Sequence, residues 1–292
     1  MKSLLNTSDL KKIDIIDIFN FADELKKNNA KPLKNMNIGM IFEKYSTRTR
    51  LSFHTAINAL GGEPIKIDFD EMNIKRIESF EDTFEILSCY IDMIVYRTDS
   101  HKKLEVASKY FKKPIINALS DFSHPCQALS DVYTLKEHFG FLDNISISWF
   151  GDMNNVLYSL CETINIIGNI KLNIFTNESI HNEKKNIFNF NNLNFFYDIN
   201  DEVISTTDCF MTDVYTSMND TDNSKELTLK KFQVNSDLIN KGKKDSIFMH
   251  CLPANINLEV TQDVIKSKKS IVKKQAYNRY VAQKGILKWL SI

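Results

Sequence analysis

The stretch FEKYSTRTR at residues 42–50 lies between an apolar run at residues 38–42 and a run of helical period at residues 51–60. Three hydroxyls and two guanidiniums are therefore predicted where a strand turns into a helix. The first amides of a helix lack internal partners and carry the positive end of the helix dipole, so such a turn binds phosphate, and Arg adds bidentate donors. The stretch alone is equally typical of an N-capping Ser followed by two solvated Arg side chains.

Apolar runs of strand length alternate along the chain with longer segments of helical period, which predicts two parallel α/β units. The polar stretch at residues 137–144 contains a glycine and predicts the boundary, giving domains 1–138 and 139–276. The expected strands cover residues 36–42, 93–96, 114–117, 145–150, 171–175, 193–197, 209–214 and 246–251. The expected helices cover residues 9–27, 48–60, 79–89, 101–110, 127–139, 155–167 and 277–290.

The composition is that of an ordinary globular protein, with 292 residues, 43% hydrophobic and 25% charged. Lys+Arg and Asp+Glu number 37 each, so the net charge gives no reason to expect a nucleic acid or an anionic membrane as partner. The five cysteines are odd in number and none are at metal-ligand spacing, which argues against a disulfide scaffold or a zinc knuckle. The N-terminus has no signal-like apolar core and no run reaches membrane-spanning length, so we expect a cytoplasmic protein.

Polar residues follow several of the predicted strands. Five such positions lie at or just after a predicted strand end: Ser46, Arg97, residues 152–155, Asp213 and residues 250–251. In parallel α/β sheets, ligands bind beyond the carboxyl ends of the strands. Five strand ends with polar chemistry are more than packing alone predicts, so a binding site for small polar ligands is expected there.

Three further motifs accompany STRTR at residues 46–50: HPCQ at residues 124–127, GDMNN at 151–155 and HCLP at 250–253. In this order and spacing they resemble the signature set of the carbamoyltransferase family, and HCLP with DVYTSM at residues 213–218 resembles its ornithine branch. The resemblance runs from about residue 4 to residue 290. It implies two Rossmann-like parallel-sheet domains bridged by helices, one for carbamoyl phosphate and one for the amino acid. It also implies that a C-terminal helix, residues 277–292, packs back on the first domain.

The resemblance implies a set of carbamoyl-phosphate ligands. The phosphate would be held by Ser46, Thr47, Arg48 and Thr49. Arg97 would reach both the phosphate and the carbonyl oxygen, where a cation stabilises the developing oxyanion. His124 would donate to the same oxygen, Gln127 would bind the carbamoyl amide as acceptor or donor, and Cys251, Leu252 and Arg279 would complete the site. The implied catalytic residues are Arg97, His124, Cys251 and Arg279.

The resemblance also implies an ornithine site. Asn155 would bind the carboxylate and Asp213 the α-ammonium, although Asn154 and Asn155 are equally typical of a turn or helix cap. Ser217 and Met218 match a loop that closes over the ornithine backbone. Cys251 and the Leu252 carbonyl would contact the side-chain amine.

Two positions depart from the family pattern. Asn219 stands where the family has glycine after Ser-Met, and Asn73-Ile74-Lys75 stands for the family's Gln-Leu-Gly. The second segment aligns with a loop that, in the family, contributes to the carbamoyl-phosphate site of a neighbouring subunit. This sharing of a loop between subunits implies a homotrimer.

The expected reaction is carbamoyl transfer from carbamoyl phosphate to the δ-amine of L-ornithine, giving L-citrulline and phosphate in arginine metabolism, with no metal and no organic cofactor. Asn219 and the altered segment Asn73-Ile74-Lys75 leave two alternatives. The acceptor is another amine such as putrescine or N-acetylornithine, or the chain is a catalytically silent relative that binds carbamoyl phosphate. HCLP argues against aspartate as acceptor. GDMNN lacks the further glycines of a dinucleotide-binding turn.

Overall fold

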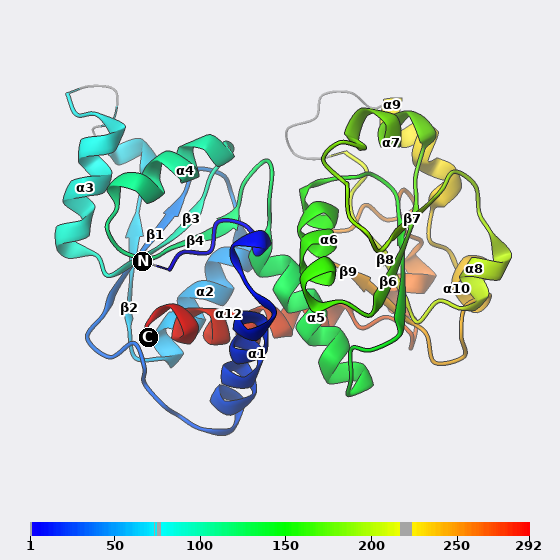
Figure 1. Cartoon of the computed structure of the whole chain (residues 1–292), viewed down its shortest axis with the longest axis horizontal. Coiled ribbons are helices and arrows are strands. Elements are labelled where there is room, and N and C mark those ends of the chain that lie inside the picture. The colour runs from blue at the N-terminus through cyan, green and yellow to red at the C-terminus, as the bar shows by residue number, and fades with distance from the viewer. Residues whose placement is uncertain (1, 73, 75–76, 217–223) are drawn as a thin grey trace. The chain divides into compact units, whose positions relative to one another are not determined.

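The computed structural model describes residues 2–72, 74, 77–216 and 224–292. The chain forms two compact units, Met1–Tyr133 with Tyr277–Ile292, and Thr134–Ala276. Two helices, α5 (Pro125–Phe139) and α12 (Val272–Leu290), each contain residues of both units (Figure 1). The division between residues 138 and 139 that the sequence suggests stays a prediction of domain organisation.

The first unit is built on a four-stranded parallel sheet of order β2-β1-β3-β4. Its strands are β1 (Asn37–Phe42), β2 (Glu63–Ile67), β3 (Met93–Arg97) and β4 (Ile115–Leu119). Its helices are η1 (Thr7–Asp9), α1 (Lys12–Lys27), α2 (Thr47–Ala59), η2 (Phe69–Glu71), α3 (Phe80–Tyr90) and α4 (His101–Tyr110), with the first part of α5 and most of α12.

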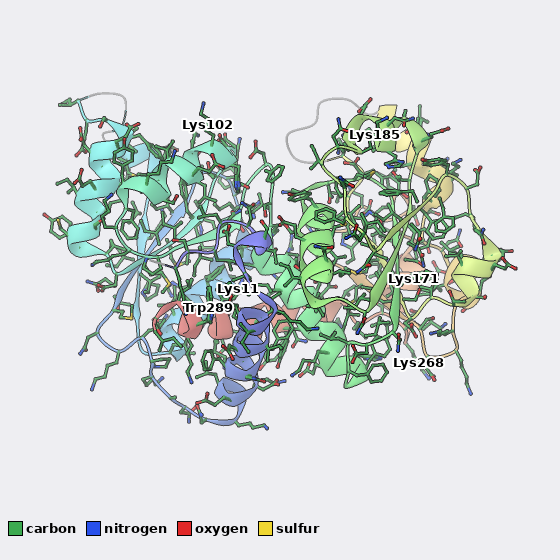
Figure 2. The ribbon with its side chains drawn as sticks, in the orientation of Figure 1. Lys11, Lys102, Lys171, Lys185, Lys268 and Trp289 are labelled. Atoms are coloured by element: carbon green, nitrogen blue, oxygen red, sulfur yellow. The ribbon has the colours of Figure 1, made fainter. Side chains whose placement is uncertain are left out.

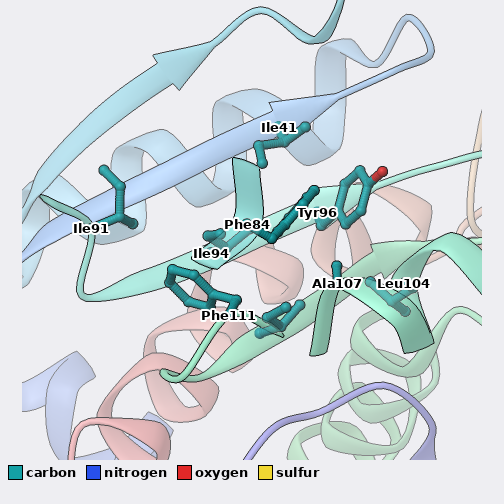
Figure 3. Packing of buried hydrophobic residues seen from close by; sticks show 9 residues of the cluster. Ile41, Phe84, Ile91, Ile94, Tyr96, Leu104, Ala107 and Phe111 are labelled. Carbon is teal, nitrogen blue, oxygen red and sulfur yellow. The ribbon is translucent and has the colours of Figure 1, made fainter. Parts of the chain in front are cut away.

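One face of this sheet carries α3 and α4. Their apolar side chains meet those of the strands in a cluster that includes Phe84, Tyr96, Leu104 and Phe111 (Figure 3). Alternate residues of β3 supply Ile94 and Tyr96 to this face, as the twofold period of a strand requires. On the other face, α1 and α12 approach so closely that a Cβ on Gly285 would lie 2.2 Å from the Ile18 carbonyl oxygen.

The second unit contains a five-stranded parallel sheet of order β7-β6-β5-β8-β9. Its strands are β5 (Ile145–Phe150), β6 (Ile170–Phe175), β7 (Leu193–Phe196), β8 (Cys209–Thr212) and β9 (Ile247–His250). Its helices are α6 (Asn155–Ile167), α7 (Glu178–Lys184), α8 (Asp201–Ser205), α9 (Ser224–Leu229), η3 (Lys230–Phe232), α10 (Ser236–Asn240) and α11 (Gln262–Lys266). All six residues of β5 are buried, as expected of the central strand of a covered parallel sheet.

The prediction of two parallel α/β sheets is confirmed. One strand, β2, was not expected from the sequence. Its short run EPIKI contains Pro64 and is only partly buried, because β2 lies at the edge of its sheet, where a proline is tolerated. The final helix begins at Val272, five residues before the expected start.

Charged side chains are distributed over the surface. Lys102 and Lys268, for example, extend from the ribbon and are exposed (Figure 2). Within the described part of the chain, no helix combines the length and apolar character that a membrane span requires.

The strand orders locate one topological switch point in each sheet. In the first unit the chain leaves β1 for β2 on one side and continues through β3 to β4 on the other. In the second unit the same reversal falls between β5 and β8. Ligands of open α/β sheets bind beyond the carboxyl ends of the strands at such points. The residues after β1, β3, β5 and β8 are therefore the candidates for function.

Candidate active site

In the first unit, Ser46 and Arg97 meet at the switch point. Ser46 is the N-cap residue of α2 with an extended backbone, yet its side chain does not cap the helix. Its hydroxyl accepts a hydrogen bond from Arg97 Nη1 at 3.1 Å. The first amides of α2 therefore lie next to a guanidinium and lack a side-chain cap, which favours an anion at this helix start.

Arg279 reaches the same helix start from α12. Its Nη2 donates to the Thr49 hydroxyl, and both side chains are buried. Thr47 and Arg48 are exposed on the first turn of α2. Arg50 has a different role, because its guanidinium lies 5.3 Å from the centre of the Phe42 ring.

His124 is placed by the start of α5, where its carbonyl accepts from the amides of Gln127 (3.1 Å) and Ala128 (3.2 Å). The side chain is buried, and this burial, followed by the charges of Arg279 and Arg97, holds the pKa of His124 well below its usual range. The imidazole is therefore neutral at physiological pH and can polarise a carbonyl through an N–H. Between His124 and Gln127, the Cys126 thiol donates to the Asn117 carbonyl at 3.3 Å, and burial raises its pKa to about 12. Cys126 is thus a packing residue.

A carboxylate that the sequence analysis did not single out fixes the turn after β1. The amide of Glu43 donates to the Arg97 carbonyl at 3.0 Å. Its carboxylate accepts from Lys103 Nζ at 2.7 Å and from the Tyr96 hydroxyl. Burial first, and this carboxylate second, raise the pKa of Tyr96 above its usual range. The signal available in the sequence was the position of Glu43 directly after a strand and before STRTR.

In the second unit, three polar side chains converge at the switch point between β5 and β8. Asp213 follows β8 and is buried. Its Oδ2 accepts from Asn154 Nδ2 at 2.8 Å, and its Oδ1 accepts from the Cys251 thiol at 2.9 Å. A carboxylate held between an amide and a thiol can exchange the thiol for an ammonium group, so the cluster suits a cationic ligand.

Asn154 has a second function that explains its position. It is the N-cap residue of α6, and its side-chain oxygen accepts from the amides of Val156 and Leu157, both at 3.1 Å. This leaves only the amide nitrogen to face Asp213. The predicted ligand Asn155 is the first residue of α6 and is partly buried. Asn154 is therefore the helix cap that the sequence suggested as one interpretation. Its contact with Asp213 was not expected from the sequence, which pointed only to Asn155 as a ligand.

The loop after β9 is held by a buried pair. His250 Nδ1 accepts from the Leu252 amide at 2.9 Å, so the ring proton is on Nε2, which faces Glu259 Oε1 at 3.2 Å. Glu259 Oε1 also accepts from the Asn255 amide. Leu252 has a positive φ of 59° and precedes a cis Pro253. Glu259 thus shapes the turn that presents Cys251 and the Leu252 carbonyl.

Asp213, His250 and Cys251 place one potential metal-ligand atom each within 4.8 Å of one another. Both His250 nitrogens already have protein partners, the Leu252 amide and Glu259. The cluster is therefore a hydrogen-bond network in this structure. A cation would have to displace one of these bonds to bind.

Asp152, after β5, is buried and lies between two lysines. Lys184 Nζ is 3.5 Å from its Oδ1, and Lys225 Nζ is 3.7 Å from its Oδ2. Lys184 also donates to the Met153 carbonyl at 2.6 Å. These contacts tie α7 and α9 to the strand end that carries Asn154. Three predicted site residues, Asn73, Ser217 and Met218, lie outside the described residues.

Comparison with known proteins gives two family matches that together span most of the chain. Residues 2–137 match the aspartate/ornithine carbamoyltransferase carbamoyl-P binding domain. Residues 143–290 match the Asp/Orn binding domain of the same family.

Individual relatives agree with these matches. The chain is 39% identical over 302 residues to an ornithine carbamoyltransferase of Methanococcus aeolicus, covering 98% of each sequence. It is 37% identical over 306 residues to that of Methanocaldococcus jannaschii, again covering 98% of each. Among solved structures, it is similar to the ornithine carbamoyltransferase from Pyrococcus furiosus, with a TM-score of 0.89, 35% identity and coverage of 98% of this chain and 96% of the other.

Proposed function

The chain belongs to the aspartate/ornithine carbamoyltransferase family, and on this premise we propose that it transfers the carbamoyl group of carbamoyl phosphate to the δ-amine of L-ornithine. The products are L-citrulline and phosphate, which places the reaction in arginine metabolism. The observation that carries the choice of acceptor is the 2.9 Å contact between the Cys251 thiol and the buried Asp213 carboxylate. It joins the HCLP segment to an anion suited to an amino-acid cation.

The first unit supplies the carbamoyl-phosphate ligands. Ser46, Thr47, Arg48 and Thr49 bind the phosphate at the start of α2. Arg97 bridges the phosphate and the carbonyl oxygen, and its contact with the Ser46 hydroxyl keeps it at the helix start. Neutral His124 donates to the carbonyl oxygen, and Arg279, held by Thr49, binds the carbamoyl group.

The second unit supplies the ornithine ligands. Asp213 binds the α-ammonium group and Asn155, with Asn154 beside it, binds the carboxylate. Cys251 and the Leu252 carbonyl contact the side-chain amine and the carbamoyl group. We also assign Ser217 and Met218 to the ornithine site, and Asn73 to a neighbouring subunit's carbamoyl-phosphate site, on family resemblance.

The reaction is a displacement at the carbonyl carbon. The neutral δ-amine forms a C–N bond while negative charge gathers on the carbonyl oxygen, where Arg97, His124 and Thr49 stabilise it. The C–O bond to phosphate then breaks, Arg48 and its hydroxyl neighbours stabilise the departing phosphate, and the phosphate accepts the amine proton. Much of the acceleration comes from the positioning of two small substrates.

The test is ureido-product formation from carbamoyl phosphate with ornithine, N-acetylornithine, putrescine and aspartate in separate reactions. Citrulline from ornithine alone is the expected result. Product from a different amine would show that the chain catalyses carbamoyl transfer to an acceptor other than ornithine. Binding of carbamoyl phosphate with no product from any amine would overturn the proposal in favour of a silent relative.

We further propose a homotrimer in the cytoplasm. Several large side chains of the first unit are at least half exposed, which supports an interface: Tyr45, Leu51, Ile77, Ile86 and Tyr90. All five cysteines lie in the described part of the chain and none of them forms a disulfide there, in keeping with a reducing compartment. Light scattering should give three times the chain mass of 33.8 kDa. A Leu51→Asp variant should lower this mass, and Leu227→Asp, at an exposed position of the second unit, should not.

A further inference from the structure

Gln127 and Asp131 form a buried pair one helical turn apart on α5. Gln127 is 1% exposed and Asp131 is fully buried. Gln127 Nε2 donates to Asp131 Oδ1 at 2.8 Å. Because residues four apart share a helix face, the two side chains lie one above the other near the start of the helix. His124 directly precedes this helix, three residues before Gln127.

This contact fixes which end of the Gln127 amide points where. A carboxylate only accepts hydrogen bonds, so the atom 2.8 Å from Asp131 must be the nitrogen. The amide oxygen, Gln127 Oε1, then points away from Asp131. It is buried and has no hydrogen-bond partner among the described residues. A buried acceptor without a donor is costly, so this oxygen is prepared for a ligand that supplies an N–H or O–H.

We propose that Asp131 is a positioning residue that sets substrate specificity by locking Gln127 as a hydrogen-bond acceptor for the carbamoyl NH₂ group. The proposal rests on the function proposed above, because it assigns the donor to carbamoyl phosphate. Acetyl phosphate has the same acyl-phosphate frame with a methyl group in place of NH₂. It would leave Gln127 Oε1 unpaired, so the locked amide discriminates against it by about 10- to 100-fold.

A purely structural pair makes a different prediction. If the hydrogen bond between Gln127 and Asp131 only stabilises α5, its loss should lower the affinity for carbamoyl phosphate and for acetyl phosphate by the same factor. The two compounds share the phosphate and carbonyl contacts. The ratio of the two affinities therefore separates the two roles. Absolute activity does not.

The test variant is Asp131→Asn, which keeps the shape of the side chain and adds an N–H donor. The new amide can donate to Gln127 Oε1, which allows the Gln127 amide to flip and present its nitrogen to the substrate. We expect the dissociation constant of carbamoyl phosphate to rise and that of acetyl phosphate to stay within about twofold. The preference for carbamoyl phosphate, expressed as its affinity divided by that of acetyl phosphate, should therefore fall about tenfold. Isothermal titration of each compound measures the two affinities.

Ser130→Ala is the matched control, because Ser130 is buried on the same helix and precedes Asp131. It should keep the wild-type ratio. A Gln127→Met background should remove the effect of Asp131→Asn on the ratio, because the amide to be oriented is gone. An unchanged ratio in folded Asp131→Asn would overturn the proposal.

A second measurement covers an Asp131→Asn variant that does not fold. In a crystal structure of the wild-type protein with phosphonoacetamide, which carries the same terminal amide, the ligand nitrogen should lie within about 3.2 Å of Gln127 Oε1. A ligand nitrogen bonded elsewhere would refute the assignment. Binding is measured without ornithine, so failure of citrulline formation by the wild-type enzyme would count against the proposed function alone.

Discussion

Arg279, in the last helix of the chain, donates a hydrogen bond to the hydroxyl of Thr49, in the first turn of α2, across 230 residues of sequence. The two groups belong to the same unit although the whole second unit lies between them in the chain. The proposed carbamoyl-phosphate site includes both residues and is therefore complete only when the C-terminal segment is packed on the N-terminal one.

The first prediction concerns this pair. Arg279→Gln removes a cation proposed to bind the carbamoyl group, so kcat/KM should fall by about 10²- to 10³-fold, the size of effect expected when one preorganised donor is removed from an active site. Thr49→Val should lower kcat/KM by a similar factor, because it removes the contact with Arg279 together with a hydroxyl proposed to bind the phosphate and the oxyanion. The two effects should be strongly non-additive in the double variant, because the residues share a bond.

The control for that cycle is Lys288→Gln. Lys288 lies on the same helix, more than two turns beyond Arg279, and its Nζ lies 2.6 Å from the Glu24 carboxylate. It should change kcat/KM by less than twofold. Additive effects of Arg279→Gln and Thr49→Val would mean that the hydrogen bond does not orient the guanidinium.

The second prediction concerns His124 and pH. Burial, followed by the charges of Arg279 and Arg97, lowers the pKa of His124 in the folded protein. Below about pH 6.5 the His124 side chain therefore binds a proton in the unfolded chain but stays neutral in the folded protein. The free energy of unfolding should therefore fall as pH drops below that value, by up to about 1.4 kcal/mol per pH unit from this residue. Denaturant titrations of His124→Gln should show a correspondingly shallower slope.

Ser123→Ala serves as the reference for this experiment, because Ser123 is buried beside His124 and does not titrate in this range. Its pH dependence should match that of the wild type. A steeper acid loss in His124→Gln than in the wild type would contradict the depressed pKa.

The third prediction concerns the loop after β9. Glu259→Ala removes the acceptor for His250 Nε2 and for the Asn255 amide, so the turn at Leu252 loses its support. The KM for ornithine should rise about tenfold or more, since an unsatisfied buried donor costs about 1–3 kcal/mol. Affinity for carbamoyl phosphate, titrated alone, should change less.

Glu259→Gln is the conservative comparison, because its amide oxygen can accept from the same two donors. It should recover most of the ornithine affinity. Equal losses in the two variants would show that the negative charge of Glu259, rather than its acceptor geometry, supports the loop.

The fourth prediction concerns the contact between α1 and α12. A Cβ at Gly285 would lie 2.2 Å from the Ile18 carbonyl oxygen, so Gly285→Ala must push the helices apart. Overpacking of this kind costs about 1–3 kcal/mol, and the melting temperature should fall by about 2–4 °C per kcal/mol. A thermal melt followed by circular dichroism measures it.

Gly140→Ala provides the contrast. No atom lies within 4 Å of a Cβ there, and only the positive φ of 78° opposes the substitution. Its melting temperature should fall less than that of Gly285→Ala. The reverse order would indicate that α1 and α12 separate at little cost.

Much of the fold was readable from local pattern. Apolar runs such as residues 145–150 are strands because a buried parallel strand must be apolar on both faces, and helical periodicity located α2 and α6. The edge strand β2 was not expected, because a short half-buried run containing Pro64 lacks that signal. Helix starts were also partly readable, since Asn154 precedes an apolar run as an N-cap does.

Local pattern in the amino-acid sequence was enough to predict the class of fold and the strand ends that carry polar groups. The partners of those groups became known only from the folded chain: Asp131 for Gln127, Glu43 for Tyr96, Glu259 for His250 and Thr49 for Arg279. The physical reason is that local pattern reports how one segment meets water or the core. A hydrogen bond between distant segments depends on strand order and helix packing, and these are fixed only when the whole unit closes around its sheet.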